Sequence, residues 1–402
     1  MFNYLKLMTA LLWLVLSMPL WSGENEPLSV YLTWKSQPQT SMCIQWISKE
    51  EIKEDVIEFQ IGEGDEWNRV VDGRHREMPA GLPYTIHSVE LLNLKPATAY
   101  RFRILSDKEK IYRFRTMPAD TTLPIRFVVG GDMYNGPLEM LEATNRAAAA
   151  ADPLFVVIGG DIAYGATGNV FKCENSDKWI DWLKVWKNTM ISPEGFLIPI
   201  VPAIGNHEVR GGKNGTPKDA EFFYALFPMP GIEGYNVLDF GDYMTLIILD
   251  SGHTNSIQGS QTEWLQRVLN ERRHFSHKFA VYHVPAYPSC RNYHAPLSRL
   301  IRKNWVPLFE QFGLHAAFEN NDHAYKRSHL IYRGRAQSAG VLYLGDGAWA
   351  VENIRKPKTP RQAWYLAKSA ASQYFMVVTL EGVHRRFQAF TPKGILFDEV
   401  CQ

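Results

Sequence analysis

Short alternating segments dominate the first part of the chain. From Leu28 to about Met117, apolar and polar residues alternate over short runs that turn residues separate, and Met42, Ile44 and Trp46 fall on one face of such a run. Alternation with a period of two is typical of strands that bury one face. The pattern predicts an all-β sandwich over residues 27–118. No cluster of candidate catalytic residues lies in it, so we interpret it as a packing module.

The pattern changes after a proline-bounded linker, residues 118–124. Continuous apolar runs then alternate with helical stretches, which predicts a layered α/β sandwich over residues 124–402. One helix is predicted to begin at a capping box of Ser260 and Glu263, and another carries Trp305 and Phe309. Strands at 374–380 and 385–390 are expected to complete a second sheet. The apolar runs are residues 125–129, 154–158, 198–204, 244–249, 279–282 and 314–318.

The first residues predict export. Lys6 precedes an apolar run from Leu7 to Leu20, so residues 1–23 have the order of a secretory signal peptide. An uncleaved anchor is the alternative, although the run is short for a membrane span and no second stretch approaches the ~20 apolar residues that a span needs. We therefore expect a secreted or periplasmic protein with no membrane span after signal removal. In an oxidising compartment Cys173 and Cys290 are the preferred disulfide pair, with unpaired buried cysteines as the alternative.

The overall charge gives no indication of a charged macromolecular partner. The chain has 43 basic and 42 acidic residues, a formal net charge of +1. No global field therefore favours nucleic acid or an anionic membrane, and no nucleic-acid binding surface is expected. The choice of partner must come from a local site.

Five polar residues come at or just beyond the ends of apolar runs, namely Asp132, Asp161, Asn206, His283 and His323. Each alone has a structural explanation as a cap, a turn or a core residue. Open α/β sheets bind ligands at the carboxyl ends of their strands, so five such residues, taken to lie on one sheet, predict a shared site. Oxygen and imidazole donors without thiolate suit Mn²⁺, Zn²⁺ and iron. The carboxylate of Asp161 can bridge two ions.

The motifs around these residues resemble those of the metallophosphoesterases, and specifically of the purple acid phosphatase-like branch. The resemblance covers nearly all of residues 28–400. A fibronectin type III-like run from Leu94 to Arg103 and the position of Tyr164 both favour that branch. The family implies a four-layer α/β/β/α catalytic domain with a dinuclear metal centre. The motifs are Gly130-Gly131-Asp132, Gly160-Asp161-Ile162-Ala163-Tyr164, Gly205-Asn206-His207-Glu208, Val281-Tyr282-His283 and Asn321-Asp322-His323.

The resemblance implies a ligand set for each of two metals. The first metal is expected to bind Asp132, Asp161, Tyr164 and His323, and the second Asp161, Asn206 and His283. A phenolate ligand favours ferric iron, so we expect iron with zinc or manganese.

Two motifs depart from the family pattern, and one of them, Val281-Tyr282-His283, has one residue fewer between valine and histidine than the family motif. Where the family has Gly-His-x-His, this chain has Asn320-Asn321-Asp322-His323, so Asn321 replaces the first histidine. An asparagine oxygen can coordinate a metal, but it binds iron or zinc less well than imidazole does. We therefore expect a weakened second metal site.

The implied activity is metal-dependent hydrolysis of small phosphate esters, of the acid phosphatase type. Two cations bind the ester oxygens, lower the pKa of bound water and stabilise the leaving oxygen. His207 is the candidate acid or phosphate contact, with a second-sphere role as the alternative, and His294 is a further candidate for contacting substrate. Lys326 and Arg327 are expected to satisfy carbonyls or carboxylates. Phosphodiester or nucleotide hydrolysis is one alternative function, and a non-catalytic metal-binding protein, which Asn321 favours, is the other.

Overall fold

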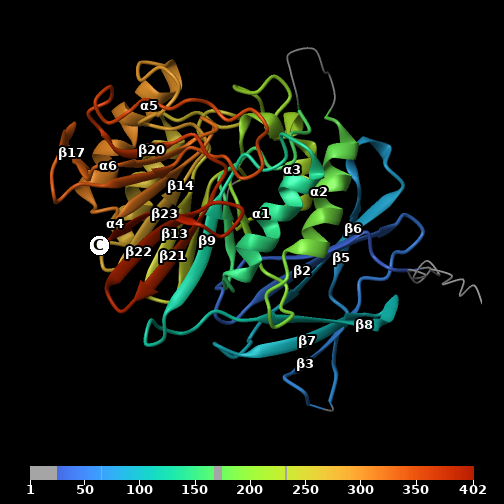
Figure 1. Cartoon of the computed structure of the whole chain (residues 1–402). Helices are drawn as coiled ribbons and strands as arrows, with labels where there is room; N and C mark the ends of the chain where they lie inside the picture. The colour runs from blue at the N-terminus through green and yellow to red at the C-terminus, as the bar shows by residue number, and fades with distance from the viewer. Residues whose placement is uncertain (1–24, 65, 167–173, 231–232) are drawn as a thin grey trace, which may run out of the picture.

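Two four-stranded antiparallel sheets form the N-terminal part of the computed structural model, which describes residues 25–64, 66–166, 174–230 and 233–402 (Figure 1). Met42, Ile44 and Trp46 of β2 are fully buried between them, so the predicted β-sandwich is confirmed. The predicted signal peptide, residues 1–23, lies outside the described residues. One sheet has the order β1 (Ser29–Thr33), β2 (Met42–Lys49), β6 (Tyr84–Leu91), β5 (Arg74–Glu77), and the other β4 (Asn68–Val70), β3 (Ile57–Ile61), β7 (Ala99–Ile104), β8 (Asp107–Arg115).

Two larger sheets pack face to face in the rest of the chain. Phe127 and Val157 of one sheet and Phe279, Val281 and Phe318 of the other bury their side chains in the same core. The six-stranded sheet has the order β11 (Ile200–Pro202), β10 (Val156–Ile158), β9 (Ile125–Gly130), β21 (Phe375–Glu381), β22 (His384–Phe390), β23 (Leu396–Cys401). The seven-stranded sheet has the order β12 (Asn236–Phe240), β13 (Met244–Ile248), β14 (His277–Val281), β15 (Ala316–Glu319), β19 (Leu342–Gly345), β16 (Tyr325–Ser328), β20 (Leu366–Ala370).

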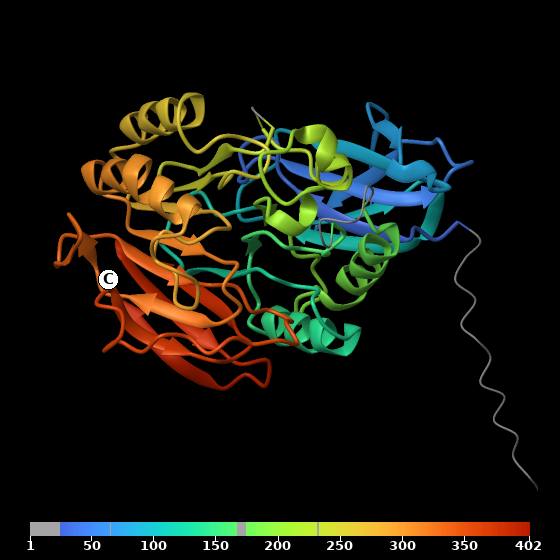
Figure 2. The same ribbon diagram turned by 90° about the horizontal axis from the view of Figure 1, so that it is seen from above.

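Helices lie on the outer face of the seven-stranded sheet and on part of the outer face of the six-stranded sheet (Figure 2). Trp182 of α2 packs in one core with Ile158 of the six-stranded sheet, and Leu265 of α4 packs in another with Ile247 of the seven-stranded sheet. The predicted four-layer α/β/β/α order is therefore confirmed. The helices are α1 (Leu138–Ala150), α2 (Ser176–Thr189), α3 (Glu221–Leu226), α4 (Ser260–Glu271), α5 (Pro296–Asn304) and α6 (Val306–Gln311), and a short hairpin pairs β17 (Ile331–Tyr332) with β18 (Arg335–Ala336).

The N-terminal sandwich is joined to the α/β layers by buried hydrogen bonds. The Ser29 hydroxyl donates to the Leu183 carbonyl at 3.0 Å, and the Tyr31 hydroxyl and Gln45 amide donate to the Leu226 carbonyl at 2.8 and 2.7 Å. Because Leu226 is the last residue of α3, these bonds satisfy a carbonyl that the helix leaves unpaired. The sandwich thus supports the helices on the six-stranded sheet.

Three predictions of local structure are wrong. Strands β21 and β22 were expected in a second sheet, but β21 pairs antiparallel with β9, the first strand of the α/β region. The N-cap of α4 is Gly259, at φ +80°, and Ser260 makes no capping hydrogen bond. The helix expected around Trp305 and Phe309 is two short helices, α5 and α6, which Trp305 separates.

Two further predictions concern cysteines and the membrane. Cys173 lies outside the described residues, so the structure does not test its pairing with Cys290, and no pair of described cysteines is bonded. Within the described ranges, no helix is long and apolar enough to cross a membrane.

Candidate metal centre

The five predicted polar residues meet at one edge of the molecule, but they come from two sheets. Asp132, Asp161 and Asn206 follow β9, β10 and β11 of the six-stranded sheet, whereas His283 and His323 follow β14 and β15 of the seven-stranded sheet. The placement on one sheet was therefore wrong. Within each group the strands run parallel, so their carboxyl ends lie together, and the packing of the sheets brings the two groups into contact.

Asp161, His283 and Asn206 form the first cluster of converging donor atoms. His283 Nε2 lies 3.2 Å from Asp161 Oδ2 and 3.1 Å from Asn206 Oδ1. The other ring nitrogen, Nδ1, lies 2.9 Å from the Gly159 carbonyl and is the nitrogen that donates to it. In the neutral tautomer Nε2 is thus a lone pair that faces two further acceptors. Three acceptors with no proton between them call for a cation.

The charges in this cluster fit a bound cation. Burial lowers the pKa of His283, but the negative charge of Asp161 outweighs burial and raises the pKa to about 9. Burial also opposes ionisation of Asp161, yet His283 and His207 hold its pKa well below the ordinary value. Without a metal, the chain therefore keeps a proton at the place where a cation would balance Asp161.

Asp132, Tyr164 and His323 form the second cluster. Asp132 Oδ1 lies 3.1 Å from His323 Nε2 and 3.2 Å from the Tyr164 hydroxyl, which is itself 3.1 Å from His323 Nε2. All three side chains are buried. Burial, with Asp132 nearby, raises the pKa of Tyr164 well above its ordinary value. A cation bound to this phenol would have to displace its proton.

The two clusters adjoin each other. Ligand atoms of Asp132, Asp161 and His283 all lie within 4.8 Å of one another, so the residues could serve neighbouring cations. The donors are carboxylate, phenol, amide and imidazole, which suit Mn²⁺, Zn²⁺ or iron. The residues present fit metal ions.

The backbone at this site is strained. Asp132, Asp161, Tyr164, Asn321 and His323 have φ of 56°, 54°, 56°, 75° and 55°. Side chains other than glycine rarely adopt this left-handed region, and such residues cluster at functional sites because the surrounding fold must hold them. The strain indicates that these side chains are positioned for a ligand.

Gly347 gives Asp132 its space, and a methyl group there should damage the site. A Cβ on Gly347, at φ +64°, would lie 1.6 Å from Asp132 Oδ2. We expect Gly347→Ala to displace Asp132 and to lower metal content at least about tenfold. The matched control is Gly394→Ala, at φ +74° with no heavy atom within 4 Å of the added Cβ. Equal metal content in both variants would contradict this role of Gly347.

Asn321 lies at the site, but its side chain is directed to an arginine. Its backbone N–H donates to Asp132 Oδ2 at 2.9 Å, while its Oδ1 accepts from the Arg291 guanidinium at 3.1 Å. Arg291 also contacts the Asn321 carbonyl and lies 3.2 Å from Asp322 Oδ1, and Arg355 donates to the same Asn321 carbonyl at 3.1 Å. Sequence reasoning missed both arginines, because no motif includes them.

Glu208 is a third residue whose role the sequence did not indicate. Its buried carboxylate accepts from the backbone N–H groups of Asp161, Gly205 and Ile162 at 2.8, 2.8 and 2.7 Å. These bonds tie the loop after β10 to the loop after β11. Burial, followed by the charge of Asp161, raises the pKa of Glu208 to about 8. Glu208 therefore positions Asp161 by holding its backbone N–H.

The two histidines predicted to contact substrate lie in different places. The His207 ring stacks on Tyr164 at 4.4 Å between centroids, and its Nε2 is 3.9 Å from Asp161 Oδ2. His294 is exposed and packs edge-on against Tyr293 near the start of α5, and none of its described contacts is to the candidate ligands. Its substrate contact stays a prediction. Lys326 pairs with the buried Asp346 and Arg327 with Asp398 of β23, so both bind carboxylates, but neither pairs with a candidate metal ligand among the described residues.

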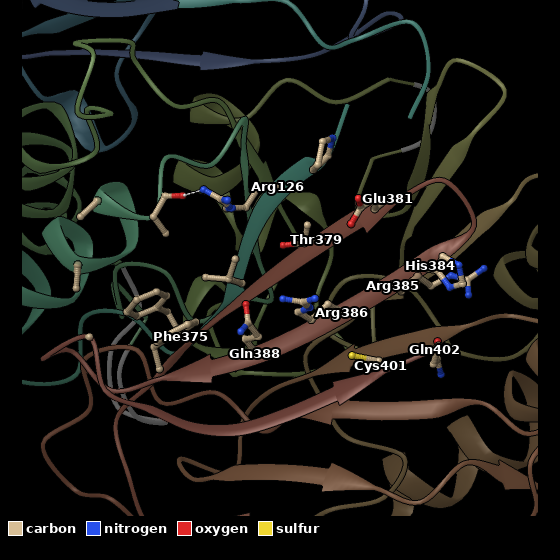
Figure 3. Close-up of a pocket in the computed structure, with 17 residues that line it drawn as sticks. Arg126, Phe375, Thr379, Glu381, His384, Arg385, Arg386, Gln388, Cys401 and Gln402 are labelled. Atoms are coloured by element: carbon tan, nitrogen blue, oxygen red, sulfur yellow. Dashed lines mark hydrogen bonds between the residues drawn. The ribbon is translucent and has the colours of Figure 1, made fainter. Parts of the chain in front are cut away.

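A large cavity among the described residues lies away from the candidate metal centre. It has a volume of about 830 Å³ and contains none of the candidate ligands. Figure 3 shows Arg126, Arg386 and Gln388 projecting from β9 and β22, with Arg126 bonded to the Ala151 carbonyl at 2.8 Å. The cavity thus belongs to the outer face of the six-stranded sheet.

The fold and site agree with the similarities of the chain to known proteins. Residues 125–318 match the calcineurin-like phosphoesterase family, and residues 27–116 match the purple acid phosphatase N-terminal domain. The chain belongs to the calcineurin-like phosphoesterases, a class of phosphoester hydrolases. With its N-terminal domain, it is a member of the purple acid phosphatase-like branch, and this family implies a dinuclear metal centre.

Relatives are distant in sequence. Purple acid phosphatase 15 of Arabidopsis thaliana is 24% identical over 69% of this chain and 57% of its own length, so the chain spans little more than half of that relative. Probable purple acid phosphatase 20 of the same plant is 22% identical over 86% of this chain and 80% of its own length. The structure of purple acid phosphatase PPD1 from yellow lupin seeds has a TM-score of 0.74 at 16% identity, covering 94% of this chain and 74% of the lupin chain. That likeness shows the fold.

Proposed function

We propose that the protein hydrolyses phosphate esters, with small phosphomonoesters as substrates, at a centre of two metal ions. The observation that carries this proposal is the convergence of the buried Asp161 Oδ2 and Asn206 Oδ1 on His283 Nε2, where a proton stands in for a cation when no metal is bound. Polar groups are not buried in this way without a compensating charge. Membership of a phosphoesterase family supports the same chemistry.

The proposed division of ligands follows the two clusters. Asp132, Tyr164 and His323 would hold one metal, Asn206 and His283 the other, and Asp161 would contact both. When bound, two cations would bind the ester oxygens, lower the pKa of bound water and stabilise charge on the leaving oxygen. Iron is proposed beside Tyr164 because phenolate favours ferric iron, with zinc or manganese as its partner.

His207 is the proposed proton donor to the leaving group. Its side chain is 28% exposed, and its Nε2 lies 3.9 Å from Asp161 Oδ2. Its Nδ1 lies 3.0 Å from the Ala166 carbonyl, which fixes the ring and leaves Nε2 to carry the transferable proton of the imidazolium. Stacking on Tyr164 holds that orientation.

Arg291 and Arg355 support a dianionic substrate. Both guanidinium groups reach the Asn321 carbonyl beside Asp132, and the Arg291 side chain is 46% exposed. Arginine presents paired donors that match phosphate oxygens. A phosphomonoester would therefore meet positive charge on the side of the centre where the family histidine is replaced.

A metal-binding protein with impaired turnover is the second candidate. Asn321 Oδ1 accepts from Arg291, which competes with metal coordination by the same oxygen. The second cation would then have fewer protein ligands and a lower affinity. Both candidate functions predict metal binding, so an assay of phosphate ester hydrolysis is needed to separate them.

The deciding experiment is an assay of the metal-loaded chain. We expect the chain loaded with iron, zinc or manganese to hydrolyse p-nitrophenyl phosphate faster than bis(p-nitrophenyl) phosphate. Faster cleavage of the bis ester would favour a phosphodiesterase. Stoichiometric metal without cleavage of either ester would favour the impaired protein, and absence of bound metal would reject the metal centre. A purple colour would support iron at Tyr164.

Replacing Asn321 with histidine tests the weakened site directly. Asn321→His is expected to raise affinity for the second metal at least about tenfold, because imidazole is a better ligand than amide oxygen for zinc or iron. The gain should be larger in Asn321→His with Arg291→Ala, which removes the competing guanidinium. Titration of the metal-free protein with metal measures the affinity of the single and of the double variant. The control is Asn68→His on the exposed strand β4. An unchanged affinity in both site variants would place residue 321 outside the coordination sphere.

The proposed location is secreted or periplasmic, and it rests on the order of charge and hydrophobicity in residues 1–23. Sequencing the N-terminus of the mature protein, recovered outside the cytoplasm, is the direct test. Retention of Met1 on a cytoplasmic protein would reject export.

A further inference from the structure

A second group of metal-ligating side chains lies in the N-terminal sandwich. His75 of β5 and His87 of β6 are directly opposite each other in the antiparallel register, so their side chains share one face. Asp55, in the loop between β2 and β3, reaches both histidines. Its Oδ2 lies 2.6 Å from His75 Nδ1 and its Oδ1 lies 2.5 Å from His87 Nδ1. Three separate segments thus converge on one carboxylate.

The backbone is shaped to bring Asp55 to the histidines. Gly73, two residues before His75, packs so closely that a Cβ there would lie 2.2 Å from the Asp55 carbonyl and 2.4 Å from its Cβ. Only glycine permits this approach. The close packing places the Asp55 side chain beside β5, an edge strand whose four residues are all exposed.

One of the two tautomers of His87 leaves its Nδ1 able to bind a cation. His87 Nε2 lies 2.7 Å from the Ser48 hydroxyl, which in turn lies 3.0 Å from the Lys49 carbonyl and 3.4 Å from the Ile52 carbonyl. When Ser48 donates its single proton to a carbonyl, its oxygen accepts from Nε2–H. His87 Nδ1 is then a lone pair that faces the Asp55 carboxylate. In this tautomer a cation can take the place of the proton between Nδ1 and the carboxylate, whereas a Ser48 hydroxyl that donates to Nε2 leaves Nδ1–H to donate to Asp55.

The His87 ring is held rigidly. Trp46, its cross-strand neighbour on β2, stacks on it at 4.7 Å between centroids with an interplanar angle of 3°, and His87 is fully buried. The stacking fixes the plane of the imidazole and therefore the direction in which Nδ1 points toward Asp55. Asp55 and His75 have side chains 13% and 36% exposed, so an ion can enter from solvent.

We propose that Asp55, His75 and His87 form a metal site, separate from the candidate centre, that binds one zinc-class divalent cation. Two imidazole nitrogens and a carboxylate without thiolate are ligands of Zn²⁺, Ni²⁺ or Cu²⁺, with water in the remaining position. Their ligand atoms lie within 4.8 Å of one another. The ion would fasten edge strand β5 to the loop that carries Asp55, so its role is structural.

Zinc binding to the metal-stripped full chain tests this site. Equilibrium dialysis with Zn²⁺, read by atomic spectroscopy, should show one fewer zinc ion per chain in His75→Ala than in the parent, while zinc at the candidate centre is retained. His75 lies on an exposed edge strand, so its removal spares the core. The matched control is His384→Ala, an exposed histidine on another strand of the chain, which should bind as much zinc as the parent.

A second variant keeps the test independent of folding. Asp55→Asn preserves the shape of the loop but removes the anionic ligand, and it should weaken zinc at this site about tenfold to a hundredfold. Circular dichroism checks that each variant is folded. Zinc stoichiometry equal to the parent in folded His75→Ala, or parental affinity in Asp55→Asn, would overturn the proposal. The test measures zinc binding alone, so its outcome does not depend on phosphatase activity.

Discussion

Asp161→Asn is expected to abolish phosphoester hydrolysis, leaving less than about a thousandth of the parent turnover. The Asp161 carboxylate accepts from the His207 backbone N–H through Oδ1 at 2.8 Å and faces His283 Nε2 through Oδ2 at 3.2 Å. Asparagine keeps the shape but not the negative charge that would hold two cations together. Losing about 4 kcal/mol of transition-state stabilisation corresponds to a thousandfold in rate. Steady-state kinetics and metal content per chain measure the effect.

The matched control is Asp239→Asn. Asp239 pairs with Arg272 at 2.8 Å on β12, far along the chain from the ligands, and its removal should leave turnover and metal content unchanged. If Asp161→Asn retained parental turnover with a full complement of metal, Asp161 would not bridge, and the two-metal proposal would fail.

Lys326→Met is expected to destabilise the fold by about 3–5 kcal/mol. Lys326 Nζ lies 2.8 Å from Asp346 Oδ1, is bonded to Glu319 and donates to the Tyr287 carbonyl at 2.6 Å. All three charged side chains are fully buried. Removing the single cation leaves two carboxylates in a low-dielectric interior, which is far more costly than losing a surface pair. Denaturant unfolding followed by fluorescence measures the change.

An exposed lysine of the adjacent strand provides the comparison. Lys368 lies on β20, which pairs with β16, and its side chain faces solvent. Lys368→Met should change the free energy of unfolding by less than about 0.5 kcal/mol. A similar small change in Lys326→Met would mean that the buried cation contributes nothing net to stability.

The sequence predicted the layers better than the pairing of strands. Continuous apolar runs identify strands covered on both faces, and this held for β9, β10 and β14. Pairing between distant strands leaves no local mark, so the sequence could not show that β21 joins β9. The start of α4 was misplaced by one residue because the backbone at Gly259 is left-handed, a choice that Ser260 and Glu263 do not encode.

The sequence identified a residue of the candidate centre when two conditions were met: the side chain is a common metal ligand, and it follows the end of a predicted strand. Asp132, Asp161 and His283 met both conditions, and the structure brings them within contact. Arg291 failed both, since it reaches Asn321 from a loop thirty positions earlier. The hydrogen bonds of Glu208 to the loop after β10 were equally hidden, because they join segments that only the fold brings together.

The division of the candidate ligands between two sheets has a thermodynamic consequence. A cation that binds residues of both sheets can be held only while the sheets stay packed, so its binding free energy is added to the cohesion of the central interface. Chelation should therefore loosen the contact between the sheets before it unravels either one. In this molecule the proposed metal centre would also stabilise the packing of the two sheets against each other. The melting temperature would therefore increase with the concentration of available metal.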